Sequence, residues 1–264
     1  MRDFDYHLAA DVQAAIEQLR GSEDGKILAG GMTLLPTLKQ NLAAPTDLID
    51  LNGIDVLRGI ALEGKTLTIK AMTIHADVGA SEVVRKAIPA LATLAGGIGD
   101  PAVRHRGTIG GSIANSDPAA DYPGAVVGLG ATIVTDRREI AGDDFFLGLF
   151  ETALEPDEII IAVRFPVPDQ AHYIKFRHPA SGYAVAAVMV SRTGGKVRVG
   201  VTGAGPCAFR VGDYEAALER EFSTQAIASI EVSSEELNSD VSCSAEYRAN
   251  LVQVLARRCV AAMV

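Results

Sequence analysis

The stretch Thr108–Asp121 reads TIGGSIANSDPAAD, a glycine pair followed by a run of short polar side chains. Glycine has no Cβ atom, so a Gly-Gly pair lets backbone N–H groups approach a bound anion closely. The polar side chains that follow are denser than a simple turn requires, and they suit the hydroxyl groups of a sugar or polyol. The alternative is a capped helix start with solvated carboxylates. We retain that interpretation for Asp117, which precedes Pro118, and expect Asp121 to bind a ligand.

A second glycine pair lies earlier, in Ile27–Leu35, which reads ILAGGMTLL. Taken alone, this segment is typical of a tight turn between a strand and a helix. Its functional interpretation is a phosphate cradle of successive backbone N–H groups, to which Thr33 adds a hydroxyl donor. Neither segment has the spacing of the Rossmann glycine fingerprint or of a Walker loop. Together they predict two sides of one site for a diphosphate-bearing cofactor.

The composition restricts the classes of partner. The 264 residues are 48% apolar, typical of a globular protein, and carry a formal charge of −9. This acidic charge argues against a nucleic-acid partner, because it leaves no basic face to neutralise phosphates. Cys207, Cys243 and Cys259 form no C-x-x-C pair, which argues against a zinc ribbon, an iron–sulfur cluster within this chain or a disulfide framework. No stretch resembles a signal peptide or a membrane span, so we expect no transmembrane segment and a cytoplasmic location.

The periodicity of apolar residues predicts an α+β protein. Candidate helices begin after Asp11, at Ser81, at Pro89 and near Ser244. Candidate strands lie at 26–29, 47–51, 66–74, 132–135, 173–177, 184–192 and 196–202. The last strand alternates valine with polar or small residues, which indicates an antiparallel sheet with one face in water. The prolines at 166 and 168 mark a domain boundary.

With their surroundings, the glycine segments resemble the FAD-binding medium subunit of molybdenum hydroxylases, a family that includes carbon monoxide dehydrogenase and xanthine dehydrogenase. The resemblance covers essentially the whole chain, through MRDFDYH, LAGGMTLLP, HADV, IGDPAVRHRGTIGGSIANSDPAADYP, DDFFLGLFETALEPDEII, KFRHPASGYA and SAEYRANLVQVLARR. It implies two FAD-binding α+β subdomains of the PCMH/vanillyl-alcohol-oxidase type, at 1–54 and 55–168. A C-terminal flavoprotein domain with a three-stranded antiparallel sheet and a helical bundle is implied at 169–264.

The resemblance also assigns a cofactor site, residue by residue. In relatives both glycine segments hold the FAD diphosphate through backbone amides, and the matching residues here are Ala29, Gly30, Gly31, Met32, Thr33 and Leu34, with Thr108, Gly110, Gly111 and Ser112. Asp121 matches a carboxylate that binds the polyol region, and Ile98 and Ile160 match positions that line the cofactor. Lys175 matches a flavin-contacting lysine, and Tyr183 matches an aromatic residue placed by the flavin ring.

The first glycine segment departs from the family pattern. Relatives often carry Gln-Ser or His-Ser after the glycine pair, where this chain has Met32-Thr33. The hydroxyl group is kept, and Met32 is left with a backbone role. Because the loop contains no histidine, we expect no covalent attachment there and predict non-covalent, dissociable FAD.

The function implied by the resemblance is electron transfer rather than substrate chemistry, with no catalytic or metal-binding residue in this chain. A small partner subunit with two [2Fe–2S] clusters would deliver electrons to FAD, and a large partner subunit would carry the molybdenum cofactor. Electrons would then leave for an external acceptor, and the complex would be a dimer of heterotrimers. The alternatives are a stand-alone flavin-dependent oxidoreductase with its own substrate and a nucleotide-binding scaffold without redox function.

Overall fold

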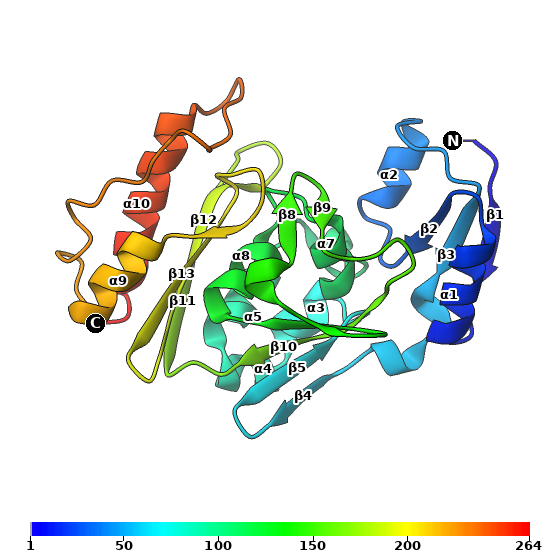
Figure 1. Cartoon of the computed structure of the whole chain (residues 1–264), viewed down its shortest axis with the longest axis horizontal. Helices are drawn as coiled ribbons and strands as arrows, with labels where there is room; N and C mark the ends of the chain where they lie inside the picture. The colour runs from blue at the N-terminus through cyan, green and yellow to red at the C-terminus, as the bar shows by residue number, and fades with distance from the viewer. Residues whose placement is uncertain (1) are drawn as a thin grey trace.

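The computed structural model describes residues 2–264 and shows three larger sheets that follow one another along the chain (Figure 1). The N-terminal sheet is parallel, in the order β1–β3–β2, and consists of β1 (Asp5–Leu8), β2 (Gly25–Leu28) and β3 (Asp47–Asp50). The helices of this unit are α1 (Val12–Gly21), α2 (Leu34–Lys39) and the short 3-10 helices η1 (Leu51–Gly53) and η2 (Asp55–Leu57). α1 begins after Asp11, as predicted, and Asp11 caps it, because its carboxylate accepts a hydrogen bond from the Ala14 amide at 2.8 Å.

The central sheet is antiparallel, in the order β4–β5–β10–β6–β7. Its strands are β4 (Ile60–Glu63), β5 (Thr66–Lys70), β6 (Thr132–Thr135), β7 (Glu139–Ala141) and β10 (Ile160–Pro166). The helices of this unit are α3 (His75–Ala80), α4 (Glu82–Ala87), α5 (Pro89–Gly96), α6 (Pro101–Arg104), α7 (Ile109–Asn115) and α8 (Asp121–Leu129). A 3-10 helix and a small hairpin complete it, namely η3 (Gly142–Asp144), β8 (Phe146–Gly148) and β9 (Glu151–Thr152).

Local signals predicted some of the boundaries of the central unit. Ser81 caps α4 and Pro89 opens α5, both as predicted. The predicted strand 66–74 is too long, since it ends at Lys70. There the Thr73 amide donates to the Lys70 carbonyl at 3.0 Å, and the chain turns into α3.

The C-terminal sheet is antiparallel, in the order β11–β12–β13–β14. Its strands are β11 (Gln170–Arg177), β12 (Ala184–Thr193), β13 (Lys196–Thr202) and the two-residue β14 (Phe209–Arg210). The helices are α9 (Gly212–Arg220) and α10 (Ala245–Ala261). The second begins next to Ser244, as predicted, and Ser244 caps it. Gly194 and Gly195 both have positive φ, 55° and 87°, in the turn that joins β12 to β13. Such a turn matches the twist of a tight hairpin.

The prediction of one solvent-facing side for this sheet is wrong. Figure 1 shows α8 on one side of β11–β13 and α9 with α10 on the other. The reason is the glycine at position 200, where a Cβ atom would lie 2.5 Å from the Gly128 amide nitrogen of α8. Glycines on both elements therefore let a helix backbone rest directly on the strand.

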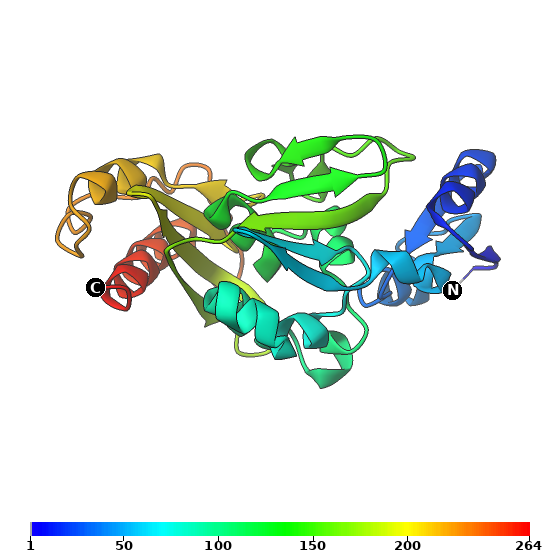
Figure 2. The same cartoon turned by 90° about the horizontal axis from the view of Figure 1, so that it is seen from below.

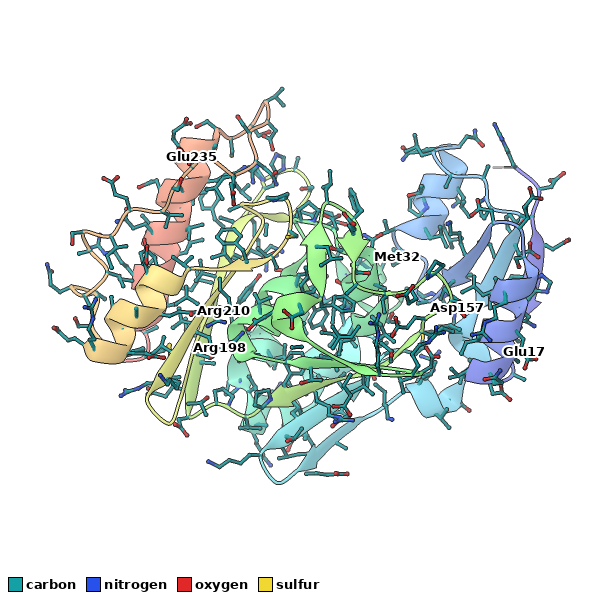
Figure 3. All side chains as sticks on the ribbon, viewed as in Figure 1. Glu17, Met32, Asp157, Arg198, Arg210 and Glu235 are labelled. Carbon is teal, nitrogen blue, oxygen red and sulfur yellow. The ribbon has the colours of Figure 1, made fainter. Side chains whose placement is uncertain are left out.

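Charged side chains add further bonds between the C-terminal sheet and the region of α8. Arg198 donates to the Val127 carbonyl at 2.8 Å and also pairs with Asp143. Arg210 pairs with the same carboxylate at 3.0 Å, and Figure 3 shows the two arginines in the same region of the C-terminal sheet.

The three units lie in a row, with the N-terminal unit and the C-terminal unit at opposite ends (Figure 2). Three apolar clusters of the described residues form their cores, around Ile49, Val163 and Val199. Phe145 and Phe146 are buried in the central cluster. Within residues 2–264, no helix is both long and apolar enough to cross a bilayer.

Candidate functional site

The two glycine segments lie against each other where the N-terminal unit meets the central unit. A Cβ atom on Gly30 would collide with the carbonyl oxygen of Arg106 and would lie 2.7 Å from the Cα atom of Gly107. A Cβ atom on Gly111 would lie 3.4 Å from that of Ala29. The absence of side chains on Gly30 and Gly111 therefore lets the backbones of both segments form one continuous surface.

The second glycine segment is anchored on the central sheet. The Gly110 amide donates to the Ala71 carbonyl at 2.8 Å, and a Cβ atom on Gly110 would lie 2.6 Å from the Cβ atom of Ala71. Thr108 is buried and caps α7, with its hydroxyl oxygen accepting a hydrogen bond from the Gly111 amide at 3.1 Å. The Ser112 amide donates to the Thr108 carbonyl at 3.0 Å.

The first segment carries free backbone donors. Among residues 2–264, the amides of Gly31, Met32, Thr33 and Leu34 donate to no acceptor, and they stand at the N-terminus of α2. Unpaired amides at a helix start attract anions through their dipoles. Free amides are thus present at the first segment, and the expectation that both segments hold a diphosphate through amides stays a prediction. At the second segment the Gly110 amide is already committed to the central sheet.

Two side chains of the first segment, Met32 and Thr33, are exposed. Met32 is 37% exposed, and Figure 3 shows it on the side of the N-terminal unit that faces the central unit. Thr33 is exposed, and its hydroxyl caps no amide of α2. The Ala29 carbonyl accepts from the Asn52 side chain at 3.0 Å, which holds the segment on the end of β3. A backbone role for Met32 and a free hydroxyl at Thr33 are compatible with this arrangement.

Asp121 begins α8 and lies in a buried ion pair. Asp121 is only 4% exposed. Lys175 of β11 donates to it at 2.8 Å, and the Tyr173 hydroxyl donates to its other oxygen. Burial raises the pKa of the Asp121 carboxyl, while the charge and hydrogen bond of Lys175 and the hydrogen bond of Tyr173 oppose the shift. The structure thus brings together two of the residues assigned from the sequence, Asp121 and Lys175.

The segment that leads into Asp121 is fixed by the C-terminal sheet. The Gly203 amide donates to the Pro118 carbonyl at 2.7 Å, and the Thr202 hydroxyl donates to the Ala120 carbonyl at 2.6 Å. Arg248 of α10 is buried and donates to the carbonyls of Val185 and Gly203 at 2.6 and 2.7 Å. The guanidinium group therefore links the start of β12 to the end of β13, which contacts the segment before Asp121.

The other assigned residues occupy different environments. Tyr183 is 46% exposed and follows Gly182, whose φ of 71° places the ring in a turn before β12. Burial raises the pKa of Tyr183, and the charges of Asp117 and Asp121 add to the rise, so the phenol lies within electrostatic reach of Asp121. Ile98 is half-buried, and its carbonyl accepts from Arg104 at 2.9 Å. Ile160 is buried in the central apolar cluster, where its side chain contributes to packing.

Two residues near Asp121 were missed, although the sequence carried a signal for them. In an extended strand, residues two apart share a face. Tyr173 and Arg177 therefore share the face of Lys175 on the predicted strand 173–177. Tyr173 bonds Asp121, and the charge of Arg177 acts on the same carboxylate.

A buried histidine, His75, contacts the chain next to the second glycine segment. The His75 amide donates to the Gly107 carbonyl at 3.0 Å, and its imidazole packs on Tyr122 with ring centroids 5.4 Å apart. Among the described residues, His75 Nδ1 and the Tyr122 hydroxyl are buried without a partner. Burial, helped by the charge of Arg104, lowers the pKa of His75 from 6.5 to about 4.

This buried imidazole predicts an acid-sensitive fold. The unfolded chain takes up a proton at His75 below about pH 6.5, whereas the folded chain does so only near pH 4. The free energy of unfolding should therefore fall by about 3 kcal/mol as the pH drops through this window. His75→Phe should flatten this part of the curve, and His105→Asn, at an exposed histidine, should leave it unchanged. Urea unfolding at a series of pH values measures both, and equal slopes in all three proteins would contradict the prediction.

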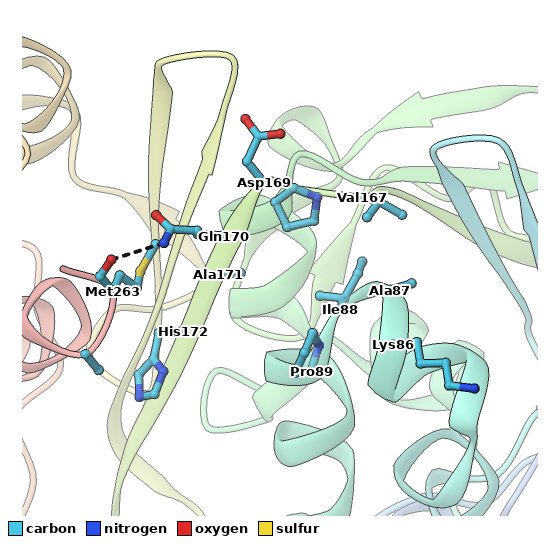
Figure 4. Close-up of a pocket in the computed structure, with 12 residues that line it drawn as sticks. Lys86, Ala87, Ile88, Pro89, Val167, Asp169, Gln170, Ala171, His172 and Met263 are labelled. Carbon is cyan, nitrogen blue, oxygen red and sulfur yellow. Dashed lines mark hydrogen bonds between the residues drawn. The ribbon is translucent and has the colours of Figure 1, made fainter.

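A cavity of about 420 Å³ lies elsewhere in the molecule, between α4, β11 and the end of the chain (Figure 4). Lys86, Pro89, His172 and Met263 are among its lining residues, and no residue of either glycine segment lines it. The glycine segments form a surface rather than the wall of this cavity.

The chain is similar to a defined family along most of its length. Residues 2–168 match the FAD binding domain in molybdopterin dehydrogenase. The carbon monoxide dehydrogenase medium chain of Hydrogenophaga pseudoflava is 38% identical over 238 residues, covering 85% of this chain and 83% of that one. The nicotine 6-hydroxylase medium subunit of Paenarthrobacter nicotinovorans is 36% identical over 269 residues, covering 97% and 95%.

A solved structure confirms the fold class. Reconstituted CO dehydrogenase from Oligotropha carboxidovorans contains a chain that superimposes with a TM-score of 0.89 at 31% identity, over 98% of this chain and 97% of that chain. The family match and the structural likeness together confirm the resemblance expected from the sequence. This chain therefore belongs to the FAD-binding medium subunits of the molybdenum hydroxylases, and is an oxidoreductase component of a multi-subunit molybdenum enzyme.

Proposed function

We propose that this chain carries FAD as an electron-transfer subunit. It would receive electrons from the [2Fe–2S] clusters of a small partner subunit and pass them to an external acceptor. The observation that supports this most strongly is the contact between the two glycine segments, with the unpaired amides of Gly31–Leu34 at its edge. Such a surface fits a dinucleotide diphosphate better than it fits an organic substrate.

The residues present fit FAD at each part of the site. The amides of Gly31–Leu34 and the hydroxyl groups of Thr33 and Ser112 would hold the diphosphate, with Gly110 and Gly111 allowing close approach of the backbone. The buried carboxylate of Asp121 would accept hydrogen bonds from the polyol chain, and Lys175 would stay beside it. The ring of Tyr183 would lie by the flavin and restrict access to it. Bound FAD supplies one- and two-electron redox chemistry, which the protein's side chains lack.

The role of the chain itself is to position and shield the cofactor. We propose subdomains at 1–54 and 55–168 that contribute the two glycine segments, and a C-terminal domain at 169–264 that contributes Lys175 and Tyr183. Support comes from the separate sheets, whose strands lie within 5–50, 60–166 and 170–210. The contact of Gly203 and Thr202 with the segment before Asp121 would then make cofactor binding depend on all three units.

The partners are also proposed. The names of the relatives, a medium chain and a medium subunit, describe members of multi-subunit enzymes. We infer for this chain a small iron–sulfur subunit and a large subunit with the molybdenum cofactor, in a dimer of heterotrimers. FAD would be bound non-covalently, because the first glycine segment offers Met32 and Thr33 where an attachment histidine would stand.

The proposed function is tested by asking which donor reduces the bound FAD. The FAD-loaded chain is mixed anaerobically either with the reduced and desalted iron–sulfur partner or with NADH, and the visible flavin absorption is followed. We expect rapid bleaching by the reduced partner and slow bleaching by NADH alone. Rapid bleaching by NADH with none by the partner would instead indicate a stand-alone flavin-dependent oxidoreductase. A chain that takes up no FAD would overturn the proposal altogether.

A further inference from the structure

The carboxylate of Asp121 is held by two different donors. The Tyr173 hydroxyl bonds one oxygen, and the Lys175 ammonium group bonds the other at 2.8 Å. All three groups are buried, with the side chains of Lys175 and Asp121 each 5% exposed. Lys175 balances the negative charge. Tyr173 adds no charge, so its contribution is a directed hydrogen bond to the ionised form.

This arrangement leaves the carboxylate able to accept further hydrogen bonds. An ionised carboxylate has about four acceptor positions, of which Tyr173 and Lys175 occupy one on each oxygen. The remaining positions suit hydroxyl donors such as those of a polyol. Once protonated, Asp121 would present a hydrogen in place of one acceptor position, and Lys175 would lose its partner in a buried environment.

The electrostatic surroundings of Asp121 come mainly from β11 and two nearby phenols. Arg177 adds positive charge, and the pKa values of Tyr122 and Tyr183 are raised, so these phenols stay neutral beside it. The helices α5 and α7 bring no ionisable side chain to α8. The other charged groups near α8 are engaged elsewhere. Arg198 and Arg210 pair with Asp143 at the end of α8 away from Asp121, and Arg164 pairs with Glu139. The charge of Asp117 raises the pKa of Tyr183.

We propose that Tyr173 is a positioning residue for the cofactor, which keeps Asp121 ionised and aimed at the polyol chain of FAD and thereby sets the lower pH limit of FAD binding. This inference rests on the proposed function. It adds a residue that lies outside the matched FAD-binding domain of residues 2–168. Tyr173 acts on FAD through Asp121.

The direction of the pH effect follows from linkage. FAD binds the ionised form of Asp121, so its affinity falls as the pH drops through the pKa of that carboxyl in the free protein. Tyr173→Phe removes a hydrogen bond to the ionised form and raises this pKa. The midpoint for loss of FAD should therefore move upward by about one pH unit, with about tenfold weaker binding in the window between the two midpoints. Well above both midpoints the affinities should converge.

The experiment is a titration of the 264-residue chain with FAD, followed by quenching of flavin fluorescence, across the pH range in which circular dichroism shows the chain folded. Tyr6→Phe is the matched control, because the Tyr6 hydroxyl bonds Asp50 at 2.7 Å in the N-terminal unit. Its midpoint should equal that of the unmodified chain. Asp121→Asn should bind FAD weakly with no midpoint in this range.

Incorporation of 3-fluorotyrosine at position 173 provides a second test with the opposite sign. Its phenol is more acidic and donates a stronger hydrogen bond, so the midpoint should move to lower pH, and the nearly unchanged shape keeps the fold even if Tyr173→Phe is unstable. Equal midpoints in the unmodified, Tyr173→Phe and 3-fluorotyrosine proteins would overturn the inference while leaving FAD binding intact. Failure of the unmodified chain to bind FAD at any pH would overturn the proposed function as well.

Discussion

Replacement of Gly30 by alanine is expected to abolish tight FAD binding and to destabilise the fold. The added Cβ atom would collide with the carbonyl oxygen of Arg106 and would come within 2.7 Å of the Gly107 Cα atom. Both are backbone atoms and cannot rotate away, so the two glycine segments must separate. Overpacking of this kind costs about 1–3 kcal/mol. The displaced amides should weaken FAD binding by about a hundredfold or more.

Gly21→Ala is the matched control for this variant. Gly21 ends α1 in the same unit, and a Cβ atom there would meet nothing within 4 Å. Fluorescence titration with FAD and urea unfolding measure the two effects. FAD affinity and stability like those of the unmodified protein in Gly30→Ala would show that the segments do not need their contact.

Replacement of Gly200 by alanine should have a comparable effect from the opposite side of the site. A Cβ atom at this position in β13 would lie 2.5 Å from the Gly128 amide nitrogen and would collide with the Gly124 carbonyl oxygen. Because α8 would have to lift from the sheet, we expect a loss of about 2–4 kcal/mol in the free energy of unfolding. Asp121 begins this helix, so FAD affinity should fall with it.

The control for the second variant is Gly212→Ala. Gly212 opens α9, and a Cβ atom there would have open space around it. Urea unfolding should place this control within about 0.5 kcal/mol of the unmodified protein. If Gly200→Ala were equally close, α8 would not depend on backbone contact with β13.

The sequence predicted those elements whose signals are local. Ser81, Pro89 and Ser244 marked helix starts because capping and proline geometry act within one turn. The turn at Gly194-Gly195 depends on a local signal of the same kind, because a tight hairpin requires positive φ. The glycine segments indicated a diphosphate site on their own, but the identity of the cofactor came from the resemblance to a family.

What the sequence left open depends on contacts between distant segments. Gly200 was interpreted as a small residue on a solvent-facing side, since its contact with Gly124 and Gly128 exists only after α8 docks on the sheet. The commitment of the Gly110 amide to Ala71 is likewise visible only in the folded chain. The pairing of Asp121 with residues of β11 required a helix start to meet a strand of another unit.

A crystal structure of the FAD-loaded protein tests most directly whether the two glycine segments form one cofactor site. We expect the diphosphate within hydrogen-bond distance of the amide nitrogens of Gly31–Leu34, with Gly110 and Gly111 facing it across the contact. Asp121 should accept a hydrogen bond from the polyol chain while it keeps its bonds to Tyr173 and Lys175. A diphosphate bound away from the amides of Gly31–Leu34 would contradict this account of the site.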